Sequence, residues 1–195
     1  MDAEEPGTRS TLAGQIVAAA KRSPRTAGTA AGVAAVLVVG TLLRYGGGAN
    51  AVLWALVQVL LVFIAWFDIQ ERRILNVVVA PAAAVAVLCR AGFDRGGLVE
   101  CAVAGAAAFA TFLVLAIIAR GGLGMGDVKF AALLGLLLGR QAFAALLGGV
   151  VVGGLAAAAI LLMRHGSRRT TYAYGPYLAL GGAMAVLLTQ PPHLA

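Results

Sequence analysis

Two aspartates stand out in this sequence because each borders an apolar run. Asp68 follows the run at residues 50–67, and Asp127 precedes the run at residues 128–138. A carboxylate beside an apolar membrane segment is costly, so its presence favours a functional role. Two carboxylates that share one proton can hydrolyse a peptide bond, because the ionised one takes a proton from water while the protonated one polarises the carbonyl. The alternative for either aspartate alone is a charge at a helix boundary.

The residues beside these aspartates have both site roles and structural roles. Gly124 and Gly126 come just before Asp127, where glycines permit a positive φ and the close approach of an extended substrate strand. Their alternative role is a plain loop. Lys129 either helps to hold a carboxylate charged, contacts the substrate, or is a positive-inside anchor. Asn76 is either a site residue or a helix cap.

The remaining candidate residues predict structure rather than chemistry. Gly175-Pro176 most simply opens the last helix, because proline is favoured in a first turn. His165 lies in a basic loop with no other His or Cys near it, so we expect neither a metal nor another cofactor. Cys89 and Cys101 form no C-x-x-C pair, so neither a zinc ribbon nor a disulfide framework is predicted.

The composition indicates a helical membrane protein. Of the 195 residues, 61% are apolar and 12% are charged, whereas a soluble domain averages about 45–50% and about 25%. The apolar runs are continuous, which favours helices over the alternating strands of a barrel. The net charge is +7, but the basic residues stand singly or in small groups between apolar runs. That pattern is typical of topology-setting loop charges and not of nucleic-acid binding.

We therefore predict an all-α, polytopic membrane helix bundle with about seven transmembrane helices. They cover residues 26–43, 50–67, 74–89, 98–119, 128–138, 141–163 and 174–189. The segment 128–138 rises only about 16 Å as a helix, so we expect it to start below the membrane surface or to lie in a thinned region.

Residues 26–190 are predicted to form the membrane-embedded domain, and residues 1–25 a cytoplasmic tail. A flexible, solvated tail is favoured there over a short interfacial helix.

The loop charges predict the orientation. With the N-terminus in the cytoplasm, eleven Lys and Arg residues fall on the inner side and four on the outer side, a clear positive-inside bias. The outer four are Arg44, Arg90, Arg95 and Arg140. Asp68 and Asp127 then share the cytoplasmic face, whereas Asp94 and Glu100 lie on the outer side and cannot join them.

Three segments resemble motifs of the type IV prepilin peptidases, which are aspartic proteases of the membrane. Residues 124–130, G-M-G-D-V-K-F, resemble the G-x-G-D-x-K-L of that family. Residues 68–76, D-x-x-x-x-x-I-L-N, resemble D-x-x-x-x-x-I-P-N, and residues 173–181, A-Y-G-P-Y-L-A-L-G, resemble P-F-G-P-x-L-A-x-G. Leu75 and Ala173 stand where the family has proline. The resemblance covers roughly residues 50–190.

This resemblance implies a short, peptidase-only form, because the paired C-x-x-C motifs near which larger members also N-methylate their product are not present. It implies Asp68 and Asp127 as the catalytic pair, with Gly175 and Pro176 near them, at the cytoplasmic face of a bacterial cytoplasmic membrane. The implied partner is a prepilin-like protein with a basic leader and an apolar helix. No nucleic-acid partner is expected.

Two other functions are compatible with paired aspartates. A small transporter can bind a cation or a proton at two carboxylates, although its site is expected near the bilayer midplane. A presenilin-like intramembrane protease shares G-x-G-D, but it lacks the D-x-x-x-x-x-I-x-N and G-P-x-L-A-x-G segments.

Overall fold

The chain folds into a bundle of α-helices, seen in a computed structural model that describes residues 12–71, 76–93, 95–119, 123–163 and 174–189. Every regular element in these ranges is an α-helix, which confirms the predicted all-α bundle. The helices are α1 (Leu12–Arg22), α2 (Pro24–Tyr45), α3 (Ala49–Glu71), α4 (Asn76–Phe93), α5 (Arg95–Ile118), α6 (Met125–Leu138), α7 (Gln141–Met163) and α8 (Gly175–Leu188).

Four of these helices are long and apolar enough to cross a bilayer, namely α2, α3, α5 and the Gln141–Ala159 part of α7. Helices α4 and α8 are shorter and also apolar, and the 14 residues of α6 rise about 21 Å. The chain is thus a multi-pass membrane protein. The number of seven spans and the cytoplasmic N-terminus stay predictions.

Helix α1 lies within the segment for which a flexible tail was favoured. Its Ala19 is buried against Trp66 and Phe67 near the end of α3, and the Arg22 guanidinium lies 3.5 Å from the Glu71 carboxylate. Residues 12–22 therefore form a helix that packs on the bundle, because their apolar positions recur at helical spacing. The division into a tail and a membrane domain stays a prediction.

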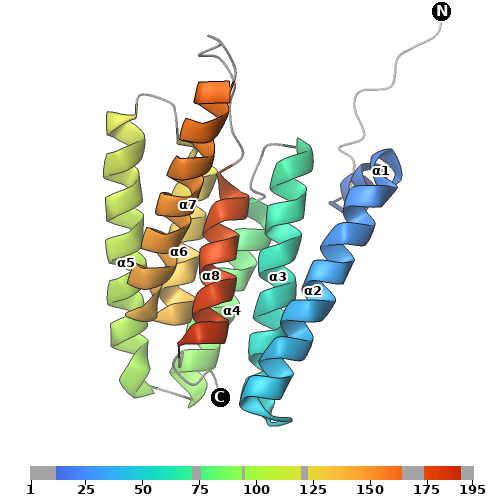
Figure 1. Cartoon of the computed structure of the whole chain (residues 1–195). Coiled ribbons are helices and arrows are strands. Elements are labelled where there is room, and N and C mark those ends of the chain that lie inside the picture. Colours follow the sequence, from blue (N-terminus) through green and yellow to red (C-terminus); the bar gives the residue numbers. More distant parts are fainter. Residues whose placement is uncertain (1–11, 72–75, 94, 120–122, 164–173, 190–195) are drawn as a thin grey trace, which may run out of the picture.

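Helix α6 lies at the centre of the bundle, in contact with α4, α5, α7 and α8 (Figure 1). Nine of its 14 residues are buried. Helices α5 and α6 approach each other closely, since a Cβ added to Gly135 would lie 2.6 Å from the Ala104 carbonyl oxygen. Small residues allow such close contacts in membrane bundles. The short α6 is thus enclosed by α4, α5, α7 and α8.

Helix α8 packs against α3 and is tied to it by a polar contact within the bundle. The buried Gln58 amide of α3 donates to the Ala183 carbonyl of α8 at 3.3 Å and to the Thr41 hydroxyl of α2 at 3.4 Å. Helix α3 ends and α8 begins at the same end of the bundle (Figure 1). That end holds the candidate site.

Candidate active site

Asp68 lies in the last turn of α3 and is only 4% exposed. It continues a buried face of this helix, because Trp54 and Leu61, at intervals of seven residues before it, are also buried. Its Oδ2 accepts a hydrogen bond of 3.1 Å from the backbone N–H of Gly175. The long apolar helix α3 thus delivers a carboxylate to the start of α8.

Gly175 lies so close to Asp68 that no side chain fits at this position. A Cβ there would lie 2.7 Å from Asp68 Oδ2 and 3.1 Å from Asp68 Cγ. As the first residue of α8, Gly175 has a backbone N–H without an intrahelical acceptor, and the positive end of the helix dipole favours a carboxylate. Pro176 stands at the first turn of α8, which confirms the predicted helix start. The sequence pattern had not predicted that Gly175 holds Asp68 directly.

Asp127 lies in the first turn of α6 and is 9% exposed. Its Oδ2 accepts a hydrogen bond of 3.2 Å from the Gly124 backbone N–H, so it does fill the structural role of a helix-boundary charge. Gly124 has φ −78° and ψ 150°, and Gly126 is part of the helix. Gly124 thus does not adopt the positive φ that a glycine permits, because an extended residue is sufficient to start α6. The close approach of a substrate strand to these glycines stays a prediction.

The structure brings Asp68 and Asp127 close enough for the charge of one to act on the other. Burial, and after it the negative charge of Asp68, raise the pKa of Asp127 to about 6, although the hydrogen bond from the Gly124 N–H acts in the opposite direction. Two buried carboxylates in this relation titrate as a coupled pair. The pair is suited to hold one proton between two groups near neutral pH.

Tyr174 is a site residue that the sequence analysis did not single out. It directly precedes α8, and its ring packs on Gly153 of α7, where a Cβ would lie 2.9 Å from Tyr174 Cε2. Burial and then the charge of Asp127 raise the pKa of the Tyr174 phenol above its usual value. The tyrosine therefore lies beside the pair as a neutral phenol. Its position in the A-Y-G-P segment, where the family has phenylalanine, was the available signal.

Lys129 and Asn76 contact each other at the margin of the site. The Lys129 ammonium donates a hydrogen bond of 3.1 Å to the Asn76 side-chain oxygen. Both residues are exposed, and they join the first turn of α4 to the first turn of α6. Whether either contacts a substrate stays a prediction.

Near the opposite end of α6, one residue of α4 lies elsewhere than the sequence pattern predicted. Arg90 was predicted as an outer loop charge, but its side chain is buried and only 1% exposed. It lies on the same face of α4 as the buried Val79 and Ala86, a spacing that was visible in the sequence. A charge at that spacing belongs to the packed face of a helix.

Among the residues that the structure describes, no three His, Cys, Asp or Glu side chains are grouped to hold a metal ion. Several positions discussed from the sequence lie outside the described residues, namely Leu75, Asp94, His165 and Ala173.

One comparison with known protein families matches the region that carries both aspartates. The profile of the type IV leader peptidase family matches residues 55–162. The prepilin leader peptidase/N-methyltransferase of Bacillus subtilis (strain 168) is 36% identical over 83 residues, which are 42% of this chain and 34% of the relative. The match thus spans about a third of that relative's length. No solved structure gives a significant match.

Proposed function

Because the chain belongs to the type IV leader peptidase family, we propose that it is a membrane aspartic endopeptidase that cleaves the leader peptide of prepilin-like proteins. Asp68 and Asp127 are its catalytic pair. The observation that carries this proposal is a set of two buried carboxylates from separate helices, each held by the backbone N–H of a glycine and close enough for the charge of Asp68 to act on Asp127. The B. subtilis relative supports the choice of substrate by its name.

The reaction follows from a pair of carboxylates that shares one proton. The ionised carboxylate takes a proton from a water molecule, whose oxygen attacks the scissile carbonyl carbon, while the protonated carboxyl donates a hydrogen bond to the carbonyl oxygen. The C–N bond then breaks, and the amine leaves with a proton supplied by the pair. The N–H groups of Gly175 and Gly124 hold both carboxylates in place during these proton transfers.

The site belongs at the cytoplasmic face of a bacterial cytoplasmic membrane. The positive-inside bias of the loops supports this orientation. There the site meets a substrate whose basic leader lies in the cytosol and whose apolar helix lies in the membrane. The negative charge of the aspartate pair attracts such a leader.

Co-expression with a prepilin substrate tests the catalytic pair. Asp68→Asn and Asp127→Asn should each abolish cleavage, because an amide neither accepts nor donates the required proton, while both variants still insert in the membrane. Glu71→Gln is the matched control, since Glu71 is an exposed carboxylate one turn beyond Asp68 on the same helix. It should cleave normally. Cleavage by a folded Asp→Asn variant would contradict the assignment.

A further inference from the structure

The C-terminal end of α6 is buried and needs hydrogen-bond donors from elsewhere. Leu137 and Leu138 are buried, and the chain turns at Gly139 with φ +57°. The last carbonyl groups of a helix have no intrahelical partner, and an unsatisfied carbonyl away from water is costly. Some of these carbonyls therefore require a donor from another helix.

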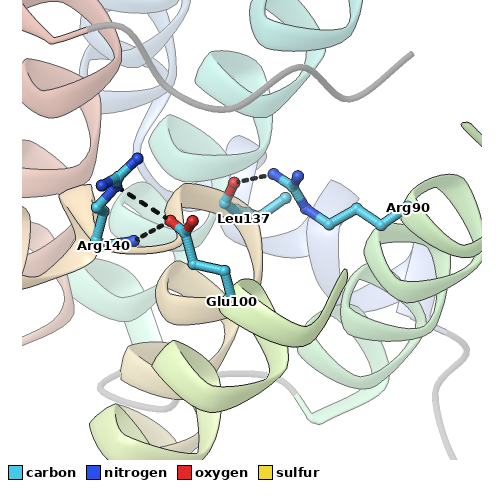
Figure 2. Close-up of polar contacts among 4 residues, drawn as sticks. All are labelled: Arg90, Glu100, Leu137 and Arg140. Carbon is cyan, nitrogen blue, oxygen red and sulfur yellow. Dashed lines mark hydrogen bonds and ion pairs between the residues drawn. The ribbon is translucent and has the colours of Figure 1, made fainter. Parts of the chain in front are cut away.

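Arg90 from the last turn of α4 supplies such donors. Its Nε donates to the Leu136 carbonyl at 3.3 Å. One terminal nitrogen donates to the Leu137 carbonyl at 2.8 Å, as Figure 2 shows. A cation at the C-terminal end of a helix is also favoured by the helix dipole. The planar guanidinium is suited to this task, because its donors are fixed relative to one another and engage two neighbouring carbonyls together.

The turn that follows α6 is held from a second helix. The Glu100 carboxylate of α5 accepts a hydrogen bond of 3.2 Å from the Arg140 backbone N–H and lies 3.5 Å from the Arg140 side chain (Figure 2). The same carboxylate lies against Gly139, where a Cβ would be 2.8 Å from its oxygen. Helices α4 and α5 thus both form polar contacts with the end of α6 that lies away from Asp127, or with the turn that follows it.

Helix α4 also contacts α6 near the aspartate. Asn76 in the first turn of α4 accepts the hydrogen bond from Lys129, two residues after Asp127. Contacts at both ends show that α4 and α6 run in the same direction, with Arg90 fixing one end and Asn76 the other. A helix of about 21 Å held in this way has little freedom to slide along its axis.

We propose that Arg90 is a positioning residue that sets the axial position of α6 and thereby the distance of Asp127 from Asp68. This inference rests on the proposed function for its catalytic meaning. Arg90 acts through the backbone of α6 and does not itself touch the reacting atoms. Without its two donors, the last turn of α6 loses its anchor on α4, and Asp127 moves relative to an Asp68 that Gly175 holds in place.

Cross-linking measures this geometry without any need for activity. A parent chain carries Asp68→Cys and Asp127→Cys, with Cys89→Ala and Cys101→Ala to remove the natural thiols. The rate of cross-linking by o-phenylenedimaleimide in membranes is compared with and without Arg90→Leu. We expect a clear loss with Arg90→Leu and a smaller loss with Arg90→Lys, which keeps the charge but not the planar fork. Arg95→Leu, an exposed arginine at the same end of the bundle, should keep the parent rate.

Kinetics on the chain with both aspartates intact give the second readout. Arg90→Leu should lower kcat by on the order of a hundredfold, because small misplacements of reacting groups have effects of that size, while KM changes little. Arg90→Lys should recover part of kcat. A general loss of packing would instead lower the thermal unfolding temperature and change kcat and KM without this rescue.

The possible results separate the two ideas. A parent chain that does not cross-link would overturn the aspartate pair, and the positioning role with it. A parent that cross-links, together with a folded Arg90→Leu chain that cross-links equally fast, would overturn the positioning role alone. If Arg90→Leu fails to fold, a folded Arg90→Lys chain with parental cross-linking and kcat would overturn it as well.

Discussion

At the scale of single residues, two glycines hold the proposed aspartate pair, and they differ in the space that surrounds them. Gly175 and Gly124 each donate a backbone N–H to one aspartate. At Gly175 the space for a side chain is already filled by Asp68, whereas a Cβ at Gly124 would make an ordinary contact of 3.4 Å with Asp127. Only Gly175 therefore requires the absence of a side chain.

Gly175→Ala should lower the cleavage rate by on the order of a hundredfold, because the new methyl group pushes Asp68 away from its position in the pair. The rate of cleavage of a prepilin substrate by the purified protein measures the loss. Gly154→Ala on α7 is the matched control, since a Cβ there meets no atom within 4 Å. Equal rates for the two variants would contradict the close contact.

The pH dependence of cleavage reports the proton that the pair shares. Because the pKa of Asp127 is raised to about 6, the rate should fall as the pH rises above that value and Asp127 loses its proton. It should also fall in acid, where the second carboxylate becomes protonated, which gives a bell-shaped profile. A pH–rate profile on a soluble leader peptide measures both limbs.

Gly124→Pro tests the cause of the alkaline limb. Proline fits the φ of −78° at this position but has no N–H, so it removes the hydrogen bond that lowers the pKa of Asp127. The alkaline limb should move to higher pH. Gly124→Ala keeps the N–H and should leave that limb in place, and the same shift in both variants would refute the explanation.

At the scale of helices, the sequence predicted the elements better than their contacts. The apolar runs marked α2 to α8 closely, because a span needs an uninterrupted apolar stretch and turns need glycine, proline or charge. The runs carried no information on which helix lies at the centre, since all of them are apolar on every side. Arg90 was misplaced for a different reason, because a count of loop charges ignores the face of the helix on which a residue lies.

The close packing of the central helix α6 at Gly135 leads to a prediction about stability. A Cβ there would lie 2.6 Å from both the Ala104 oxygen and the Gly105 Cα, so α5 and α6 must separate to admit it. Gly135→Ala should destabilise the bundle by about 1–3 kcal/mol, the usual effect of overpacking. Thermal unfolding in detergent measures this loss. Gly148→Ala, on an open face of α7, should show none of it.

At the scale of the whole molecule, the proposed site takes residues from three helices that are distant along the chain. Asp68 lies in the last turn of α3, Asp127 lies in the first turn of α6, and Gly175 is the first residue of α8. The motifs in the sequence indicated these residues, because each stands at the end of an apolar run on one predicted side. Their direct contacts depend on packing between helices, which no single segment encodes.

The proposed orientation predicts which residues reagents reach from each side of the membrane. Glu71 lies at the same end of α3 as Asp68, and Arg95 is the first residue of α5, at the end of the bundle that holds Arg90. Each is replaced by cysteine in a separate variant. A maleimide that does not cross membranes should label Arg95→Cys when it is added to intact cells. It should label Glu71→Cys only after the cells are opened. The opposite labelling would reverse the proposed orientation.

The hydrogen bond from Gly175 to Asp68 also bears on how the protein is made. Helix α8 is the last described helix to leave the ribosome, and until it docks against α3 the carboxylate of Asp68 lacks the N–H that holds it. Under the proposed function, a chain whose α8 has not yet docked lacks one of the two backbone contacts that hold the aspartate pair. Cleavage is therefore expected only after α8 has packed against α3.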